Sequence, residues 1–293
     1  MHPSRFHRGR HFAAVLLTLG LGLGFSQAVR ADAPARVFVA STGDDANVGS
    51  PTSPKRNFQA AHDAVAAGGE IVVLNTAGYG HLAINKSVTV TVPPGVNGFV
   101  TVPAGVNGID INANASDAVI LRGLSIEGVG SGSGYGISGI TVGTLRVEAC
   151  TVRNFSVGVY FAGASAAHLV MNDSNVRDVG SGILAGSVGS SQTVTALITR
   201  CKVDNASFFG IDGFTGASSA ITRVFVSECI LTNNNTALVG ASNGVFVYAD
   251  NCVVSRNATG VTVSNGGKTF SRGNNTFSNN VSNGAFTFSL AAK

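Results

Sequence analysis

The fold is decided by the stretch Leu-Arg-Val-Glu-Ala-Cys-Thr-Val-Arg-Asn at residues 145–154, because its pattern returns through most of the chain. Apolar and polar residues alternate on both sides of Cys150, which is typical of strands with one buried face. We call the Cys150 position the anchor. It recurs at spacings of 24, 27, 28, 23 and 23 residues in Cys150, Ser174, Cys201, Cys229, Cys252 and Asn275. A repeat of this length indicates a solenoid.

Two further columns of the repeat predict how each unit is built. Leu124 extends the series of anchor positions by one earlier unit. The position two after the anchor is always apolar: Ile126, Val152, Val176, Val203, Leu231, Val254 and Phe277. The position four after it holds turn-forming residues in most units: Gly128, Asn154, Asp178, Asn205, Asn233, Arg256 and Asn279. Because Asn and Asp tolerate the left-handed backbone conformation, this column predicts a ladder of stacked turns.

Two solenoid classes fit the first half of the unit. A leucine-rich repeat also allows Cys or Asn at the anchor, but it needs a helix or a similar segment afterwards. Residues 154–163 are instead rich in Gly, Val and polar residues and offer no helical face. We therefore predict an all-β protein, a right-handed single-stranded parallel β-helix.

The N-terminal residues 32–75 depart from the repeat. They predict a strand over 37–40, a loop to residue 54, a short helix with Phe58, Ala61 and Val65 on its apolar face, and a strand over 70–74. An open solenoid end exposes unpaired backbone, so the helix is expected to cap it. We expect a single domain over 32–293, with coils over 76–285 and a C-terminal closure over 286–293.

Residues 1–31 predict a secretory signal peptide. Arg5, Arg8 and Arg10 precede an apolar run over 12–25, and small residues follow for cleavage after Ala28 or Ala31. The run is short for a membrane span and is interrupted by glycines. We expect a mature chain without a transmembrane segment that is secreted, either periplasmic or extracellular.

The net charge of +4 arises in this leader. Of 19 basic residues, four precede Asp32, which leaves 15 basic and 15 acidic residues in the mature chain. A neutral balance gives no support for nucleic acid or an anionic membrane as a partner.

Several short strings carry a resemblance to a known family. They are Arg36-Val-Phe-Val, Ala77-Gly-Tyr-Gly, Lys86-Ser-Val-Thr, Leu121-Arg-Gly-Leu and Val152-Arg-Asn-Phe. The chain resembles the pectin-lyase-like right-handed β-helix superfamily, and in particular its secreted bacterial repeat proteins. The resemblance implies, for the enzymes of that superfamily, either clustered Asp residues in hydrolases or acidic calcium ligands with an Arg or Lys base in lyases.

No column of the repeat places carboxylates on two neighbouring units, as either kind of enzyme site would need. Asp110 and Asp212 each follow an inward Ile but lie about four coils apart. The weak catalytic candidates are Asp110, Asp173, Asp204, Asp212 and Arg177. Two charged columns favour ladders of ion pairs instead. The expected pairings are Asp173–Arg200–Glu228, Glu127–Arg153 and Arg177–Asp204.

Metal and cofactor sites have little support in the sequence. Asp44 and Asp45 suit either calcium or a turn, and we favour the turn. His62, His81 and His168 lack metal-ligand spacing. We therefore predict no metal site and no cofactor.

The cysteines are expected to be stacked and chemically inert. Cys201, Cys229 and Cys252 fall on successive coils, whereas Ser174 separates Cys150 from them, which leaves room for at most one disulfide, within the trio.

The leading functional hypothesis is a secreted, non-catalytic scaffold that presents one face to an extracellular polysaccharide or another cell-envelope component. The expected contacts are Arg146, Arg153, Tyr160 and Arg177, with Tyr79 and Tyr135 as further aromatic rings. One alternative is a polysaccharide lyase, hydrolase or epimerase, which would need two carboxylates about 6–9 Å apart. The other is a structural or adhesive envelope protein.

Overall fold

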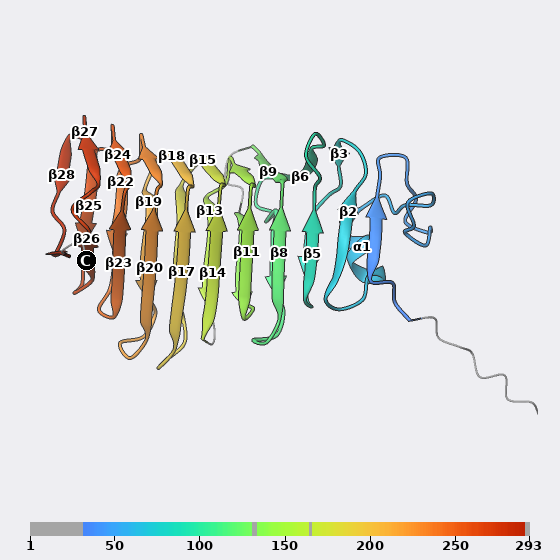
Figure 1. Cartoon of the computed structure of the whole chain (residues 1–293), viewed down its shortest axis with the longest axis horizontal. Coiled ribbons are helices and arrows are strands. Elements are labelled where there is room, and N and C mark those ends of the chain that lie inside the picture. Colours follow the sequence, from blue (N-terminus) through green and yellow to red (C-terminus); the bar gives the residue numbers. More distant parts are fainter. Residues whose placement is uncertain (1–31, 131–133, 164–165, 291–293) are drawn as a thin grey trace, which may run out of the picture. The chain divides into compact units, whose positions relative to one another are not determined.

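Each repeat unit forms three short strands that bend around a common core, and successive units stack on one another (Figure 1). The computed structural model describes residues 32–130, 134–163 and 166–290. The chain divides into two compact units, Met1–Asp32 and Ala33–Lys293. The first, and with it the predicted signal peptide, lies outside the described residues except for Asp32.

In the described part of the chain, the strands form three parallel sheets, which we number 1 to 3 in chain order. Sheet 1 has 11 strands: β1 (Arg36–Val39), β2 (Gly69–Val73), β5 (Val88–Thr91), β8 (Ala118–Arg122), β11 (Thr144–Glu148), β14 (Ala167–Asn172), β17 (Thr193–Thr199), β20 (Ile221–Ser227), β23 (Val245–Asp250), β26 (Lys268–Ser271) and β29 (Phe288–Ser289).

Sheet 2 contains the strands that follow each anchor. Its nine strands are β3 (Ala77–Gly78), β6 (Gly98–Pro103), β9 (Leu124–Val129), β12 (Thr151–Arg153), β15 (Asn175–Val179), β18 (Lys202–Ala206), β21 (Ile230–Thr232), β24 (Val253–Ser255) and β27 (Thr276–Ser278).

Sheet 3 completes each coil. Its nine strands are β4 (Leu82–Ile84), β7 (Ile109–Asn112), β10 (Tyr135–Thr141), β13 (Val157–Gly163), β16 (Ser181–Ser187), β19 (Phe209–Thr215), β22 (Thr236–Gly240), β25 (Thr259–Val263) and β28 (Ser282–Gly284). Neighbouring strands in each sheet belong to successive coils. The prediction of an all-β parallel solenoid is confirmed.

The left-handed turns lie at two columns of the repeat. The predicted ladder between sheets 2 and 3 is confirmed, with φ from 55° to 63° at Asn154, Asp178, Asn205, Asn233, Arg256 and Asn279. A second column, between sheets 1 and 2, has φ from 50° to 74° at Gly123, Ala149, Asp173, Arg200, Glu228 and Asn251. Because φ is positive at both bends, each coil turns sharply within one or two residues.

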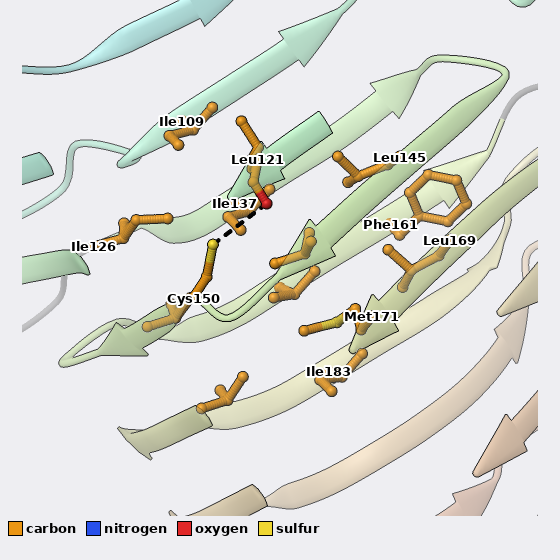
Figure 2. Packing of buried hydrophobic residues seen from close by; sticks show 14 of the residues in the cluster. Ile109, Leu121, Ile126, Ile137, Leu145, Cys150, Phe161, Leu169, Met171 and Ile183 are labelled. Atoms are coloured by element: carbon orange, nitrogen blue, oxygen red, sulfur yellow. Dashed lines mark hydrogen bonds between the residues drawn. The ribbon is translucent and has the colours of Figure 1, made fainter. Parts of the chain in front are cut away.

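The inward residues of the three sheets meet in one continuous apolar core. Figure 2 shows Leu121, Leu145 and Leu169 of sheet 1 beside Ile137 and Phe161 of sheet 3. Since the residues of a column come from successive coils, like side chains stack on like, and the core extends from coil to coil.

The anchor side chains are buried and hydrogen-bonded to the backbone. The Cys150 thiol donates to the Leu121 carbonyl at 3.5 Å, as Figure 2 shows, and the Cys150 amide donates to Ser174 Oγ at 3.1 Å. Burial raises the pKa of the Cys150 thiol to about 12. All four cysteines are free and buried, and the trio Cys201, Cys229 and Cys252 stacks as predicted.

The predicted helix is α1 (Phe58–Ala64), shorter than expected because Val65 is already extended. It packs against β1, β2 and β4. The Gln59 side chain accepts a hydrogen bond from the Ala83 amide at 2.8 Å and donates one to the Ala83 carbonyl at 3.4 Å. One amide side chain thus replaces the missing neighbour strand of β4 at this edge, which is how α1 covers it.

At the C-terminal end, β29 pairs with β26, and the last strands of all three sheets are largely exposed. Residues 291–293 of the expected C-terminal closure lie outside the described part. Among the described residues, no helix is long and apolar enough to cross a membrane.

Candidate functional site

The outer face of sheet 1 carries three columns of side chains, and the middle column changes in character along the stack. It begins with charged and aliphatic residues and ends with aromatic rings. In register order it reads Arg36, Glu70, Thr89, Ile120, Arg146, Val170, Leu197, Phe225, Tyr248, Phe270 and Phe288.

The four rings of this column form a continuous stack. The ring centroids of Phe225 and Tyr248 lie 4.8 Å apart, those of Tyr248 and Phe270 4.7 Å, and those of Phe270 and Phe288 5.0 Å, with interplanar angles of 9°, 16° and 20°. Because each ring covers its neighbour's face, the stack presents ring edges to solvent. Ring edges carry partial positive charge, so they suit anionic groups.

One flanking column adds formal positive charge to this face. It contains no acidic residue: Ala118, Thr144, His168, Thr195, Arg223, Phe246 and Lys268. Lys268 Nζ lies 5.7 Å from the centroid of the Phe246 ring. Within the described part of the chain, Arg146, Arg223 and Lys268 form no ion pair. Arg223 and Lys268 belong to this column, whereas Arg146 lies in the middle column. We call these three cations, which are available to a ligand, the cationic row.

The other flanking column is balanced in charge. Arg122 pairs with Glu148 at 2.8 Å, and Arg272 pairs with Asp250 at 3.8 Å. A hollow of about 210 Å³ beside this column is lined by Leu197, Phe225, Tyr248, Asp250 and Arg272, among others. The cations beside the aromatic stack that have no ion pair, Arg223 and Lys268, therefore lie on one side of it.

The structure distributes the four predicted ligand contacts over three sheets. Arg146 lies on the outer face of sheet 1, and Tyr160 lies on sheet 3. Arg153 and Arg177 occupy the same register position on neighbouring strands of sheet 2. Only Arg153 and Arg177 come together, beside a hollow of about 200 Å³. The four residues cannot form one surface.

Both arginines on sheet 2 are held by acids. Arg153 pairs with Glu127 at 2.6 Å, as expected. The expected Arg177–Asp204 pair is wrong: Arg177 bonds to Asp178 at 2.5 Å, while Asp204 bonds to Lys202 at 3.3 Å. Asp204 also accepts from Thr232 and Asn233, so its acceptor sites are filled by its own coil and the next one.

The predicted catalytic carboxylates are dispersed, and three of them have structural partners. Asp110 accepts from Asn107 at 2.7 Å and lies 3.1 Å from His81 Nε2. Asp173 accepts a bidentate pair of hydrogen bonds from Arg200, which holds the pKa of the Asp173 carboxyl below its usual value. Burial alone would raise the pKa of Asp204, but hydrogen bonds from Thr232 and Asn233 outweigh it and lower the pKa.

Asp212 is different, because it is buried without a partner. It is 7% exposed between Leu184 and Val239 of the neighbouring coils, and its Oδ1 accepts no hydrogen bond within the described residues. Burial raises the pKa of Asp212 to about 7. The register places it four coils from Asp110, as the sequence indicates, so the two cannot act on one bond.

The described residues contain no group of three or more His, Cys, Asp or Glu side chains arranged to hold a metal ion. Asp45 accepts hydrogen bonds from the amides of Arg56 and Asn57 and from the Asn57 side chain. Asp44 accepts from the Ala46 amide. These bonds agree with the preferred turn-forming role of the two carboxylates.

The aromatic residues expected as sugar contacts pack against the protein itself. Tyr79 is fully buried against Phe58, and its hydroxyl donates to Asn75. Tyr160 is stacked between Tyr135 at 4.8 Å and Phe214 at 5.9 Å. In place of open platforms for sugars, these rings pack against other rings of the protein.

Sequence reasoning missed the aromatic stack of sheet 1 and the His81–Asp110 pair. The signal for the stack was present: the residue four before the anchor is Leu197, Phe225 and Tyr248 in three successive units. His81 and Asp110 do not occupy equivalent positions of the repeat, because Ala83 is the residue in register with Asp110. Column alignment could not bring that pair together.

Comparisons with known proteins do not assign a family. No family model matches the chain, and no curated protein matches it. Among solved structures, the chain is similar to the GH136 lacto-N-biosidase from Eubacterium ramulus, over 88% of this chain and 67% of that one, with 10% sequence identity and a TM-score of 0.36. A likeness at this level carries no conclusion about activity.

Proposed function

We propose that this protein is an exported, non-catalytic β-helix scaffold of the pectin-lyase-like superfamily that binds an anionic polysaccharide along the outer face of sheet 1. The observation that carries the proposal is the cationic row: Arg223 and Lys268 lie in the column beside the aromatic stack, and Arg146 lies in the column of the stack, three strands before its first ring. The cations and the partly positive ring edges both attract an anionic ligand.

The geometry of the face favours a polymer over a small molecule. The columns run across consecutive coils, and neighbouring strands lie about 4.8 Å apart, so contacts recur along the stack. Each exposed cation contributes little alone, but contacts along one chain act together through their high effective concentration. An extended polyanion uses all of them at once.

The distribution of acidic groups supports a scaffold that does not cleave its ligand. No column of described strands puts carboxylates on adjacent coils, and the outer face of sheet 1 near the cationic row holds none of the predicted catalytic residues. Glycoside hydrolysis needs two carboxylates on either side of one bond. The alternative of a polysaccharide-active enzyme has no comparable arrangement to support it.

The test is binding of the full chain to anionic polysaccharides (polygalacturonate, alginate and heparin) and to neutral ones (dextran and xyloglucan). We expect the anionic set to bind, and the triple variant Arg146→Ala, Arg223→Ala, Lys268→Ala to bind at least tenfold more weakly, which corresponds to about 1.4 kcal/mol. The matched control removes three positive charges from sheet 2 and its turn: Arg153→Ala, Lys202→Ala, Arg256→Ala.

Equal loss in the control variant would show that net charge, and not the face of sheet 1, governs binding. Absence of binding to every anionic polymer would overturn the proposal. Turnover of a uronate polymer, detected as a rise in ultraviolet absorbance or in reducing ends, would contradict the non-catalytic part of it.

A further inference from the structure

A third hollow lies on a different part of the molecule, at the turns between sheets 2 and 3. It has a volume of about 610 Å³ and is lined by the turns of four consecutive coils. At about 4.8 Å between coils, its length is roughly 14 Å. Its polar lining comes from Asn154, Ser156, Asp178, Asn205 and Ser207. We call it the turn cleft.

The cleft is open because its turns carry small residues. The position after the buried turn residue is Ser156, Gly180 and Ser207 in the cleft, and Asn235 in the next coil. A Cβ at Gly180 would lie 2.4 Å from the Ser156 carbonyl oxygen, so no side chain fits there. Beside Ser207 the chain has one extra turn residue, Phe208, which is 59% exposed. The short turns are thus bordered by a bulkier one.

The side-chain amides of Asn154 and Asn205 in the cleft are held in place by hydrogen bonds to neighbouring coils. Asn154 Nδ2 donates to Glu127 Oε1 at 3.3 Å, and Asn205 Nδ2 donates to Asp178 Oδ1 at 2.9 Å. Each bond fixes an amide plane and leaves its oxygen as an acceptor. In the described part of the chain, neither Asn154 Oδ1 nor Asn205 Oδ1 accepts a hydrogen bond, and the Ser156 hydroxyl makes none.

The charges around the cleft cancel. Asp178 Oδ2 accepts from Arg177 at 2.5 Å, and Glu127 Oε2 accepts from Arg153 at 2.6 Å. No cation is among the described residues that line the cleft, so an anionic ligand gains nothing from them, and a cation meets a carboxylate that is already neutralised. What the cleft offers is a row of fixed acceptors, Asn154 and Asn205, each with a serine hydroxyl on the same coil. Such a row matches the hydroxyl donors of an uncharged sugar.

We propose that the turn cleft is a second binding site, distinct from the outer face of sheet 1, and that it takes a neutral oligosaccharide. The sugar hydroxyls donate to Asn154 Oδ1 and Asn205 Oδ1, and the Ser156 hydroxyl, on the same coil as Asn154, adds a further contact. The length of the cleft suits several linked sugars better than one. The site does not depend on the binding of an anionic polymer to sheet 1.

The experiment titrates the full chain with neutral oligosaccharides (malto-, cello-, xylo-, manno- and chito-oligosaccharides) at up to millimolar concentration and follows the side-chain amide signals of Asn154 and Asn205 by NMR. At least one of these series is expected to shift both signals. The variant Ser156→Trp fills the cleft and should weaken binding by tenfold or more. The control Ala258→Trp places the same side chain at the equivalent exposed position of a turn outside the cleft.

Two results would overturn the proposal: no neutral oligosaccharide shifts the two amide signals, or Ser156→Trp binds as well as Ala258→Trp. An effect seen only with uronate oligomers would also contradict it. The triple variant Arg146→Ala, Arg223→Ala, Lys268→Ala should keep full binding in the cleft, so failure of the sheet 1 proposal and failure of this one are told apart. Near-native circular dichroism of both Trp variants guards against misfolding.

Discussion

The amide nitrogen of Cys201 donates a hydrogen bond to the sulfur of Cys229, 3.4 Å away on the next coil. The same bond is made by other residues of the anchor column: Cys150 donates to Ser174 Oγ at 3.1 Å, and Cys252 donates to Asn275 Oδ1 at 2.8 Å. Cys, Ser and Asn interchange at the anchor because each offers a short polar atom to the backbone of the preceding coil. The stack is therefore more than an inert filling of the core.

The anchor bonds predict a difference between two substitutions of Cys229. Cys229→Ser keeps a polar atom and should change the free energy of unfolding by less than about 1 kcal/mol, whereas Cys229→Val leaves the Cys201 amide unpaired and should cost about 1–3 kcal/mol. Urea unfolding followed by circular dichroism measures both. A valine variant as stable as the serine variant would remove the anchor bond as the explanation.

A buried ladder of asparagines joins the last coils. Asn257 Oδ1 accepts from the amide and side chain of Asn234, and Asn257 Nδ2 donates to Asn280 Oδ1 at 2.9 Å. Asn257→Val should destabilise the protein by about 2 kcal/mol or more, because several buried groups lose partners together. Asn235→Ala, at an exposed turn position nearby, should stay within about 0.5 kcal/mol. Thermal unfolding of the two variants compares them.

Asp212 predicts a pH dependence of stability. Its pKa is about 7 in the folded protein and near the ordinary aspartate value of 3.8 in the unfolded chain, so between these values the folded state alone keeps the proton. Stability should therefore fall as pH rises from about 4 to 7 and level off above that range. Asp212→Asn should remove this fall and be more stable than the parent at pH 8, by about 2–4 kcal/mol. Parallel pH profiles for parent and variant would show that Asp212 is not the titrating group.

The hydrogen bond between the Ala83 amide and the Gln59 side chain predicts that this amide of the edge strand β4 is protected from hydrogen exchange. Gln59→Ala removes the acceptor of the Ala83 amide, so the hydrogen exchange of that amide should accelerate by tenfold or more while the core strands stay protected. Gln59→Glu keeps an acceptor oxygen and should retain most of the protection. If Ala83 exchanges at the same rate in all three proteins, α1 does not seal β4 through this side chain.

The cationic row predicts that binding of an anionic polysaccharide depends on salt. The Debye length falls from about 10 Å at 0.1 M ionic strength to about 3 Å at 1 M, so exposed charges should lose most of their attraction. Binding to the full chain should weaken strongly over this range, and the triple variant of the row should show a flatter salt dependence. A salt-independent affinity would contradict a contact made through the cationic row.

The sequence determined the coil. Strand positions, both sheet registers around the anchor, the left-handed turns between sheets 2 and 3 and the stacked cysteines follow from a pattern of period two inside a repeat of 23 to 28 residues, and such patterns act between nearest neighbours. The second column of left-handed turns, just before the anchor, appears only in the structure. The prediction for Asp173 and Arg200 was right because they occupy the same column on adjacent coils and face the same way.

Only the tertiary structure decided which surfaces the side chains share. Arg146, Arg153 and Tyr160 lie at different offsets in the unit, and the two bends of each coil send these offsets to three different faces. Arg177 pairs with Asp178 and not with the expected Asp204. The carboxylate of Asp204 already accepts from Lys202, Thr232 and Asn233. The burial of Asp212 and the stacking of Tyr248 on Phe270 likewise depend on neighbours from other coils. Aligning the repeat shows which residue types share a column, but it does not show how their side chains pack.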